Sequence, residues 1–560
     1  MAIIIQSATA DLRFDGDPNM RLWAYNGLDC VATRQIVDAL RPSVEAHAAI
    51  SYNFVRAMQA PALDMMLRGI MVNPVVRRQT AQLLIAERDA LQLKLDALTN
   101  AVWGRGLNVN SPKQLLAFFY GALNMPVQYA LRKTPQGKKR TPSTDHKALE
   151  ALAKMEVKGP GISAYDRKWS KVQYAQPFVS LITAIRDRGK KLAVVNSGID
   201  RDGRFRCSYN VAGTVTGRWS SSKNVLNGGS NLQNITEVMR RMFCADDGMK
   251  LAAPDLEQAE SRMVAGLVWQ CTGDDTYWRA CESGDLHTIV CTMAYPEKFV
   301  GIGGWDFDKG AFVGDLKACR AIADEPHYRH LSLRDLAKRI GHGSNYYGPP
   351  FGIAMMIGIP VKVVTEFQRR YFRAFPAIPK WHAHVIRTLQ TEGKLVTPVE
   401  RQRIFFGRLY EDSTLREAIA NIPQSTIGEL LNLMLYKVWE EGIRDPAFRR
   451  SVQLLLQVHD SIVFQYPDRG NAYEDATIAR VEKLMSVALP LTRTADDGTL
   501  EVRNLHLPLE FKTGWNWSRN DPKKELFPDG NPDGLRKYAP GTDIRKRLQS
   551  AKPTLSEWLD

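Results

Sequence analysis

Apolar residues follow two kinds of spacing along this chain. Between Arg78 and Leu98, leucines recur every three or four positions, which predicts a long amphipathic helix. Elsewhere, short apolar runs are interrupted by polar centres. Between Leu454 and Phe464, two apolar halves flank His459 and Asp460, a pattern that predicts a β-hairpin with Asp460 at its tip.

A second carboxylate stands at the end of another apolar run. The run Leu251–Pro254 leads to Asp255, and polar residues including Gln258 and Glu260 follow at helix-start spacing, so we expect Asp255 where a strand becomes a helix. Alone, such an aspartate is more often a cap or turn residue. If folding brings Asp255 and Asp460 together, they could hold Mg²⁺, which prefers a few carboxylates plus phosphates and water.

Composition narrows the class of protein. A chain of 560 residues suggests three or four domains, and a net charge of +15 indicates a polyanionic partner. No apolar run approaches the roughly 20 residues of a membrane-spanning helix, and the N-terminus lacks the pattern of a signal peptide. Seven cysteines without a Cys-x-x-Cys pair favour free thiols in a reducing cytoplasm.

One further helix carries a cationic face. Arg334, Lys338, His342 and Tyr346 recur every four residues, so they share one side of a helix. A stripe of two cations followed by an imidazole and a phenol is poorly suited to a core. It suits a triphosphate, with the cations neutralising phosphate charge.

These stretches, together with Thr216-Gly217-Arg218, Gly284-Asp285-Leu286-His287 and Arg416 to Gln424, resemble successive motifs of family A DNA polymerases. The resemblance covers roughly residues 50–517. It implies a helix-rich α+β fold shaped like a right hand, with an antiparallel palm sheet, helical fingers and a helical thumb. The expected divisions are an exonuclease remnant (1–50), thumb (51–200), palm (201–270 and 411–517), fingers (271–410) and a basic C-terminal tail (518–560).

The resemblance also implies roles for individual residues. Two Mg²⁺ ions, for which Mn²⁺ could substitute, are expected at Asp255 and Asp460, with Lys338 as a third catalytic residue. The expected nucleotide-binding residues are Arg334, Lys338, His342, Tyr346, His287, Glu260 and Gln258. The expected DNA-binding residues are Arg218, Gln424, Arg416, His459, Asn231, Gln233, Lys113, Lys138, Lys139 and Arg140, of which the last three belong to a basic loop that would contact phosphates.

The sequence departs from the family pattern in several places. Ser461 stands where the family commonly has Glu, His342 where it has Phe or Tyr, and an extra tyrosine, Tyr347, leaves the end of the cationic helix uncertain by one residue. Tyr25 and Asp29 resemble a single motif of a 3′–5′ exonuclease. Because the other acidic motifs of that domain are missing, we expect no intrinsic proofreading, and the many departures resemble phage-type members.

The expected activity is therefore DNA-templated extension of a primer 3′ end with dNTPs, in phage or bacterial replication or repair. A separate exonuclease or a processivity factor is a further expected partner. Two alternatives remain open. A single-subunit RNA polymerase shares a related palm, although Glu260 matches the residue that crowds the sugar 2′ position in DNA polymerases. A non-catalytic DNA-binding homologue would keep the shape without the chemistry.

Overall fold

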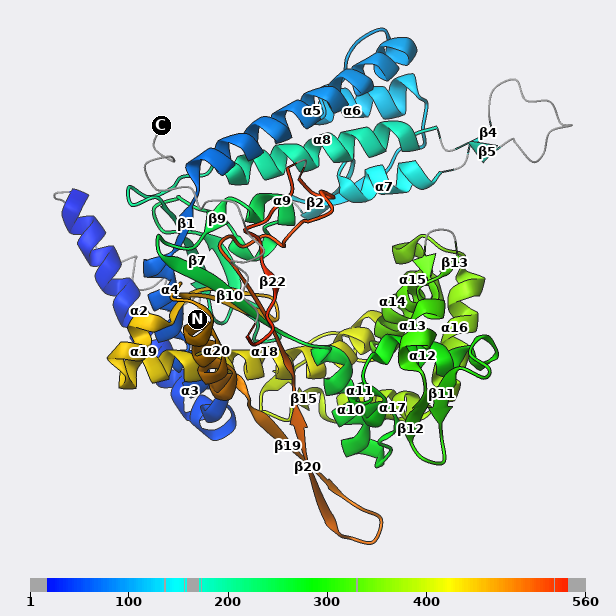
Figure 1. Cartoon of the computed structure of the whole chain (residues 1–560). Coiled ribbons are helices and arrows are strands. Elements are labelled where there is room, and N and C mark those ends of the chain that lie inside the picture. The colour runs from blue at the N-terminus through cyan, green and yellow to red at the C-terminus, as the bar shows by residue number, and fades with distance from the viewer. Residues whose placement is uncertain are drawn as a thin grey trace, which may run out of the picture.

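The computed structural model describes residues 18–134, 137–155, 157–158, 171–172, 174–328, 331–527 and 529–541. Figure 1 shows a body that contains the main sheet, with one helical lobe above it and a second at its side. All paired strands run antiparallel apart from one isolated bridge, which agrees with the predicted helix-rich α+β class. No helix among these residues is long and apolar enough to cross a membrane.

The main sheet has five strands in the order β17, β18, β10, β21, β22. They are β10 (Met249–Leu256), β17 (Gln453–Val458), β18 (Ser461–Pro467), β21 (Leu509–Gly514) and β22 (Arg536–Lys537). Successive residues of β10, β17 and β18 are buried, so both faces of these strands are covered, and this explains their continuous apolar runs. The register places Asp255 opposite Ser461 on one side and Glu510 on the other.

Shorter strands and several helices complete the body around one continuous hydrophobic core. The strands are β1 (Ile70–Val72), β6 (Arg204–Phe205), β9 (Phe243–Cys244), β7 (Cys207–Asn210) and β8 (Ser220–Lys223). The helices are α4 (Gln59–Arg68), η2 (Leu232–Asn234), α9 (Glu237–Arg240), α10 (Ala259–Thr272), α18 (Asp412–Arg444), α19 (Pro446–Ser451) and α20 (Asn471–Met485). α10 packs against α18, which anchors the helix that follows Asp255.

The first helical lobe has its own core. Its elements are α5 (Pro74–Trp103), α6 (Pro112–Leu116), η1 (Ala117–Ala122), β2 (Tyr129–Thr134), β3 (Gly137–Pro142), α7 (His146–Lys154), β4 (Val157–Lys158), β5 (Lys171–Val172) and α8 (Gln176–Val195). α5 contains the predicted amphipathic helix and begins four residues before it, because Asn73 caps two backbone N–H groups ahead of Pro74. The aromatic core of Phe118, Phe119 and Phe178 packs separately from that of the body.

The predicted basic loop is instead the hairpin β2–β3, in which Arg132 pairs with Lys139 and Leu131 with Arg140. A two-stranded hairpin that is exposed to solvent can carry charged side chains on both faces. These residues therefore form strands although their sequence lacks alternating apolar positions. Lys139 and Arg140 are exposed, whereas the side chain of Lys138 lies outside the described part of the structure.

The second helical lobe lies beside the body across from the first (Figure 1). Its helices are α11 (Thr276–Glu282), α12 (Leu286–Ala294), η3 (Pro296–Lys298), α13 (Leu316–Ala323), α14 (Leu333–Asn345), α15 (Pro350–Ile357), α16 (Val361–Ala374) and α17 (Ala377–Glu392). Its strands are β11 (Gly303–Asp306), β12 (Ala311–Gly314), β13 (Pro326–Tyr328), β14 (Leu331–Ser332), β15 (Lys394–Val396) and β16 (Gln402–Ile404). α14 begins with a capping box in which Ser332 and Asp335 bond each other's backbone N–H.

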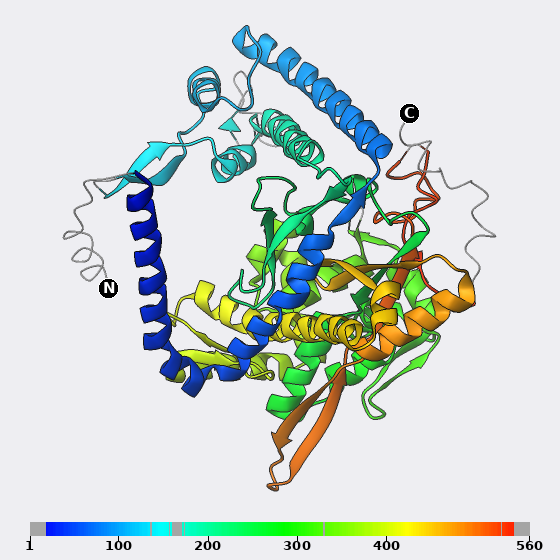
Figure 2. The same cartoon turned by 90° about the vertical axis from the view of Figure 1, so that its left-hand side faces the viewer.

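Two elements project from the body. Helix α2 (Pro18–His47), which contains Tyr25 and Asp29 and leads into α3 (Ala49–Ala57), runs away from the body in Figures 1 and 2. The long hairpin of β19 (Ala488–Thr494) and β20 (Leu500–His506) projects below it. Toward the C-terminus, residues 518–527 and 529–541 of the predicted tail fold onto the body, because β22 extends the main sheet and Ser518 bonds Glu237. Residues 542–560 lie outside the described part.

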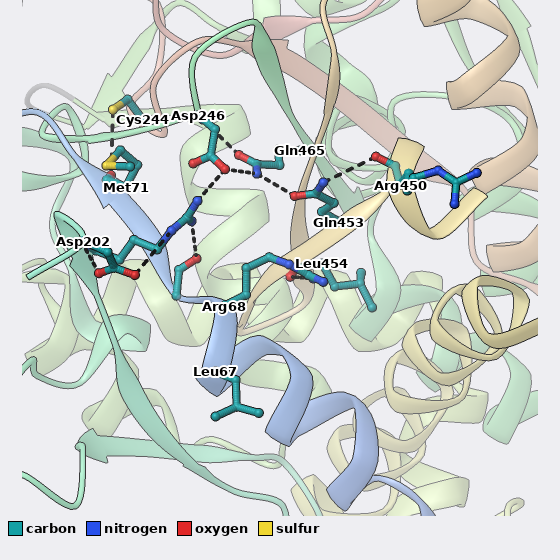
Figure 3. A network of polar contacts seen from close by, with 12 residues as sticks. Leu67, Arg68, Met71, Asp202, Cys244, Asp246, Arg450, Gln453, Leu454 and Gln465 are labelled. Carbon is teal, nitrogen blue, oxygen red and sulfur yellow. Dashed lines mark hydrogen bonds and ion pairs between the residues drawn. The ribbon is translucent and has the colours of Figure 1, made fainter. Parts of the chain in front are cut away.

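A polar network ties the base of the first lobe to the main sheet (Figure 3). Arg204 donates to Asp246 at 2.5 Å, and the amide of Gln465 on β18 donates to the same carboxylate at 2.7 Å. From α4, Arg68 donates to the carbonyl of Leu454 on β17. The strands that carry the central hairpin are therefore fixed to the segment from which α5 rises.

Candidate active site

Asp255 and Asp460 meet at one end of the main sheet. Asp255 is the penultimate residue of β10, and Asp460 lies in the two-residue turn between β17 and β18, as the sequence predicted. His459 turns the chain with φ of 53°, and the backbone N–H of Leu256 donates to the carbonyl of Asp460. Both carboxylates line a cavity of about 500 Å³, although some 200 residues separate them in the sequence.

Each of these carboxylates faces a cation from the protein. Lys512 Nζ lies 3.7 Å from Asp255 and 3.5 Å from Glu510, and Arg218 Nη2 lies 3.2 Å from Asp460. Burial raises the pKa of Asp255, while Lys512 opposes that rise. No role was predicted for Glu510 or Lys512 from the sequence. Their i, i+2 spacing on β21, which puts them on one face, was the available signal.

The donor set fits a hard divalent cation. Asp460 Oδ1 is buried and accepts no hydrogen bond from any described residue. The guanidinium of Arg218 lies 3.2 Å away, but its N–H groups do not form a hydrogen bond to this oxygen. No group of three or more His, Cys, Asp or Glu side chains among the described residues is arranged to hold a metal. Two carboxylates sharing one cavity therefore suit an ion that completes its shell with water and substrate phosphates, as Mg²⁺ does.

Arg218 joins the carboxylates to the cationic helix. Its guanidinium also lies 3.5 Å from Glu260 on α10, and the other oxygen of Glu260 lies 3.2 Å from His342 Nδ1 on α14. Gly428 of α18 leaves room for Arg218, since a Cβ there would come within 3.1 Å of its Cγ. A continuous row of ionisable groups thus runs from Asp460 to α14.

Along α14, the predicted face is present but its members have different partners. Arg334 donates two hydrogen bonds to Asp285, at 2.9 and 3.0 Å, whereas Lys338 is exposed. The His342 ring contacts Tyr346 edge-on, with centroids 4.8 Å apart. Tyr346 is half-buried, but its hydroxyl is buried next to Glu260, and this burial raises the pKa of Tyr346 well above the usual value. Tyr347 instead contacts His382, so of the two tyrosines it is Tyr346 that lies beside His342.

His287 lies among these cations at the start of α12. Burial lowers its pKa to about 4, and the charges of Arg334, Lys338 and His342 act in the same direction. A neutral imidazole at neutral pH is consistent with a position beside a bound polyanion, where it can donate a hydrogen bond without a fixed charge.

The pKa of His287 makes a prediction for stability. Its folded pKa of about 4 lies below the ordinary 6.5, so between these values the unfolded chain binds a proton that the folded chain does not. The stability that neutral His287 contributes is complete above pH 6.5 and declines as the pH falls toward 4. We expect Tm to fall less steeply across this window in His287→Gln, as measured by differential scanning fluorimetry.

The exposed His384 on α17 supplies the control, since His384→Gln is expected to leave that slope unchanged. Parallel slopes for His287→Gln and the unchanged chain would contradict the assignment.

The remaining residues expected at the nucleotide or at the DNA occupy different surroundings. Gln258, expected at the nucleotide, is the cap residue before α10 and has a φ of 54°. Of the residues expected at the DNA, His459 and Lys113 are exposed. Arg416 and Gln424 lie half-buried on α18.

Both amide hydrogens of the buried Gln233 are donated within the protein, to Trp219 and Gln457, and Asn231 accepts from Ser221. Gln233 therefore supports the hairpin turn, because Gln457 in turn donates to the carbonyl of His459. Its expected contact with DNA stays a prediction.

The sequence matches known proteins over most of this region. The sequence model of the family described as DNA polymerase family A matches residues 79–296 and 320–519. The chain belongs to DNA polymerase family A.

Its relatives include thermostable DNA polymerase I of Thermus thermophilus, which is 28% identical over 405 residues, covering 69% of this chain and 41% of the relative. DNA polymerase I of Chloroflexus aurantiacus is 26% identical over 518 residues, covering 89% of this chain and 46% of the relative. This family A chain thus spans less than half the length of these curated relatives. The POL domain of Pol1 from M. smegmatis, solved in complex with DNA primer-template and dNTP, shares the fold with a TM-score of 0.56 at 21% identity, covering 82% of this chain and 70% of that one.

Proposed function

We propose that this chain is a DNA-directed DNA polymerase that extends a primer 3′ end with dNTPs. The observation that carries the proposal is the row of contacts from Asp460 through Arg218 and Glu260 to His342, which connects a carboxylate of the cavity to α14, the helix that carries Arg334 and Lys338. Phosphoryl transfer depends on positioning and charge stabilisation more than on covalent chemistry, and these groups supply both. The family's DNA polymerase I members support the same activity.

The lobes take the corresponding roles in this proposal. The first lobe, which lies within the expected thumb bounds of 51–200, would be the thumb. Residues 201–270 and 411–517 would be the palm, and 271–410 the fingers. Asp255 and Asp460 would hold Mg²⁺, which, when bound, lowers the cost of deprotonating an attacking hydroxyl and stabilises a leaving oxygen. Lys338, Arg334 and His287 would hold the triphosphate of the incoming nucleotide, and Tyr346 would lie beside the new base pair. Primer-template DNA would lie between the thumb and the fingers.

Primer extension tests the proposal directly. The purified chain, Mg²⁺, four dNTPs and a labelled primer annealed to a longer template are expected to give products that end at the template 5′ end. When one of the four dNTPs is left out, extension should stop just before the first template base that requires it. Template binding without extension under any divalent cation would instead support the non-catalytic alternative.

Glu260 supplies a separate prediction about the sugar. Its carboxylate is held from two sides by Arg218 and His342, which supports the crowding of a 2′-OH that the resemblance implies for this residue. We expect Glu260→Ala to reduce the preference for dNTPs over rNTPs by at least about tenfold in kcat/KM, because the crowding side chain is removed. Single-nucleotide incorporation with each nucleotide type measures this ratio.

Glu257→Ala is the matched control, because Glu257 is an exposed glutamate three residues earlier. Its preference is expected to match that of the unchanged chain. Efficient rNTP incorporation by the unchanged chain would favour an RNA polymerase and overturn the role of Glu260.

A further inference from the structure

Residues 297–319, which lie between the two stretches that the family's sequence model matches, have a defined structure in the second helical lobe. It contains the hairpin β11–β12 and the start of α13. Phe299, Trp305 and Cys319 are buried in the main core, so the segment is packed firmly onto the lobe. In Figure 1, β11 and α16 lie on the side of this lobe remote from β10. The segment is therefore well separated from the carboxylate pair.

An apolar cleft of about 490 Å³ opens between this segment and the end of α12. That volume lies within the range of about 300–1,000 Å³ typical of sites that enclose a ligand. Three large apolar side chains on its lining are exposed: Val300 (79%), Phe307 (62%) and Val313 (46%). Exposed apolar residues gathered around one cleft are a feature of interaction sites.

Trp305 gives a second indication of a ligand. This residue lines the cleft and is 8% exposed, and its indole N–H is buried without an acceptor among the described residues. Buried indole N–H groups usually find a hydrogen-bond partner, because leaving one unmet costs about 1–3 kcal/mol. Because this N–H has almost no exposed surface, a carbonyl or carboxylate oxygen of a bound segment would satisfy it once the indole shifts toward the cleft.

Arginines border the cleft. A second cavity, of about 380 Å³, shares Met293, Pro296 and Phe307 with the first and is lined by Arg369, Arg370 and Arg373 of α16. Arg369 and Arg370 share the carboxylate of Glu366, and Arg370 also pairs with Glu297. Arg373 is exposed and forms no ion pair with any described residue. Three guanidinium groups against two carboxylates leave an excess positive charge beside the apolar cleft.

We propose that these two cavities form a docking site for an acidic peptide segment of a partner protein. One or two large apolar side chains of the segment fill the cleft lined by Phe307 and Trp305. Acidic side chains beside them pair with the arginines of α16, and Arg373 is the free cation. This combination fits a peptide better than a nucleic acid, because the cleft offers apolar surface and few groups for a continuous row of phosphates.

Fluorescence anisotropy with the full chain tests the proposal. The probe is a fluorescein-labelled peptide of six aspartates followed by phenylalanine and leucine. Two comparison peptides replace either the aspartates by asparagine or the two apolar residues by serine. We expect saturable binding of the first peptide, weakened at least about tenfold in each comparison peptide and reduced by added salt.

Two variants locate the site. Phe307→Ser and Arg373→Glu are each expected to weaken binding at least about fivefold, whereas Phe406→Ser and Arg408→Glu, which change exposed residues outside both cavities, should not. Primer extension by all four variants serves as the check on folding. It is expected to stay within about twofold for Phe307→Ser and Arg373→Glu, which separates this proposal from the proposed polymerase activity.

Several outcomes would overturn the docking site. The first is that the acidic peptide shows no saturable binding at chain concentrations up to about 1 mM. The second is that the asparagine or the serine peptide binds with the same affinity as the acidic peptide. The third is that Phe307→Ser and Arg373→Glu both bind the acidic peptide as tightly as the unchanged chain does. If a single-stranded oligonucleotide competes with the peptide, and both Phe307→Ser and Arg373→Glu abolish this competition, the surface would be assigned to nucleic acid. A dimer in sedimentation that Phe307→Ser dissociates would assign it to a second copy of the chain.

Discussion

Asp255→Asn and Asp460→Asn are each expected to reduce primer extension by about 10³-fold or more, the largest loss that any single substitution should cause. Asparagine keeps the shape of the side chain but removes the negative charge that a divalent cation requires. Loss of a single preorganised charge-stabilising group at a reacting centre already costs about 10²–10³-fold, and loss of a metal ligand should cost at least as much. Single-turnover incorporation of one dNTP, at saturating Mg²⁺, measures the effect.

Stability and DNA binding should respond differently from catalysis. Burial raises the pKa of Asp255, so its ionised form is disfavoured in the folded state, and the neutral asparagine is not expected to lower Tm. Lys512 keeps Glu510 as a partner after the substitution. Primer-template affinity, measured by anisotropy, is expected to stay equal or increase, because a negative charge near the DNA has been removed.

Asp247→Asn is the matched control, since Asp247 is an exposed aspartate on the turn before β10. Its extension rate is expected to match that of the unchanged chain. Retention of more than about a tenth of the activity by either Asp255→Asn or Asp460→Asn would remove the basis for the proposed site.

The carboxylate pair could be anticipated from the sequence because each aspartate ends a strong apolar run. Such runs locate strands that are buried on both faces, and the boundary of a run locates the residue at the end of the strand. The cationic face of α14 was equally accessible, since a four-residue repeat defines a helix face without knowledge of its neighbours. What both patterns have in common is that the signal is local.

Partners across elements were not accessible in the same way. Nothing near Arg334 in the sequence indicates that Asp285, 49 residues earlier, accepts both its hydrogen bonds. Lys512 approaches Asp255 only because β21 pairs with β10, and that register is set by the whole sheet. The hairpin β2–β3 and the edge strand β22 were missed because strands exposed to solvent need no apolar alternation.

Lys338→Ala and Arg334→Ala are expected to reduce dNTP incorporation by similar factors but to differ in stability. Each removes a cation that would neutralise the triphosphate, and a loss of about 10²–10³-fold in kcat/KM is the usual magnitude for one such group. Lys338 is exposed, so its removal should change the free energy of unfolding by less than about 0.5 kcal/mol. KM for the dNTP and kcat, from single-nucleotide incorporation, should both worsen.

Arg334→Ala leaves the carboxylate of Asp285 without its main partner. Burial acts to raise the pKa of Asp285, yet hydrogen bonds from Arg334 and Thr288 hold it below the usual value. Because Arg320, at 3.7 Å, and Thr288 remain, the expected loss of stability is about 1–3 kcal/mol, not the larger cost of a fully isolated buried charge. Denaturant unfolding at neutral pH measures this difference between the two variants.

Protonation of Asp285 should remove the distinction. Stability that depends on a carboxylate with a lowered pKa is present above its unfolded pKa and is lost as the pH falls through the folded one. The difference in stability between the two variants should therefore shrink as the pH falls below about 3.8. Arg339→Ala, an exposed cation next to Lys338, is the control and should preserve both activity and stability. Equal destabilisation by Lys338→Ala and Arg334→Ala at neutral pH would show that Lys338 has a structural partner, and it would then no longer be the free cation that the proposed triphosphate site requires.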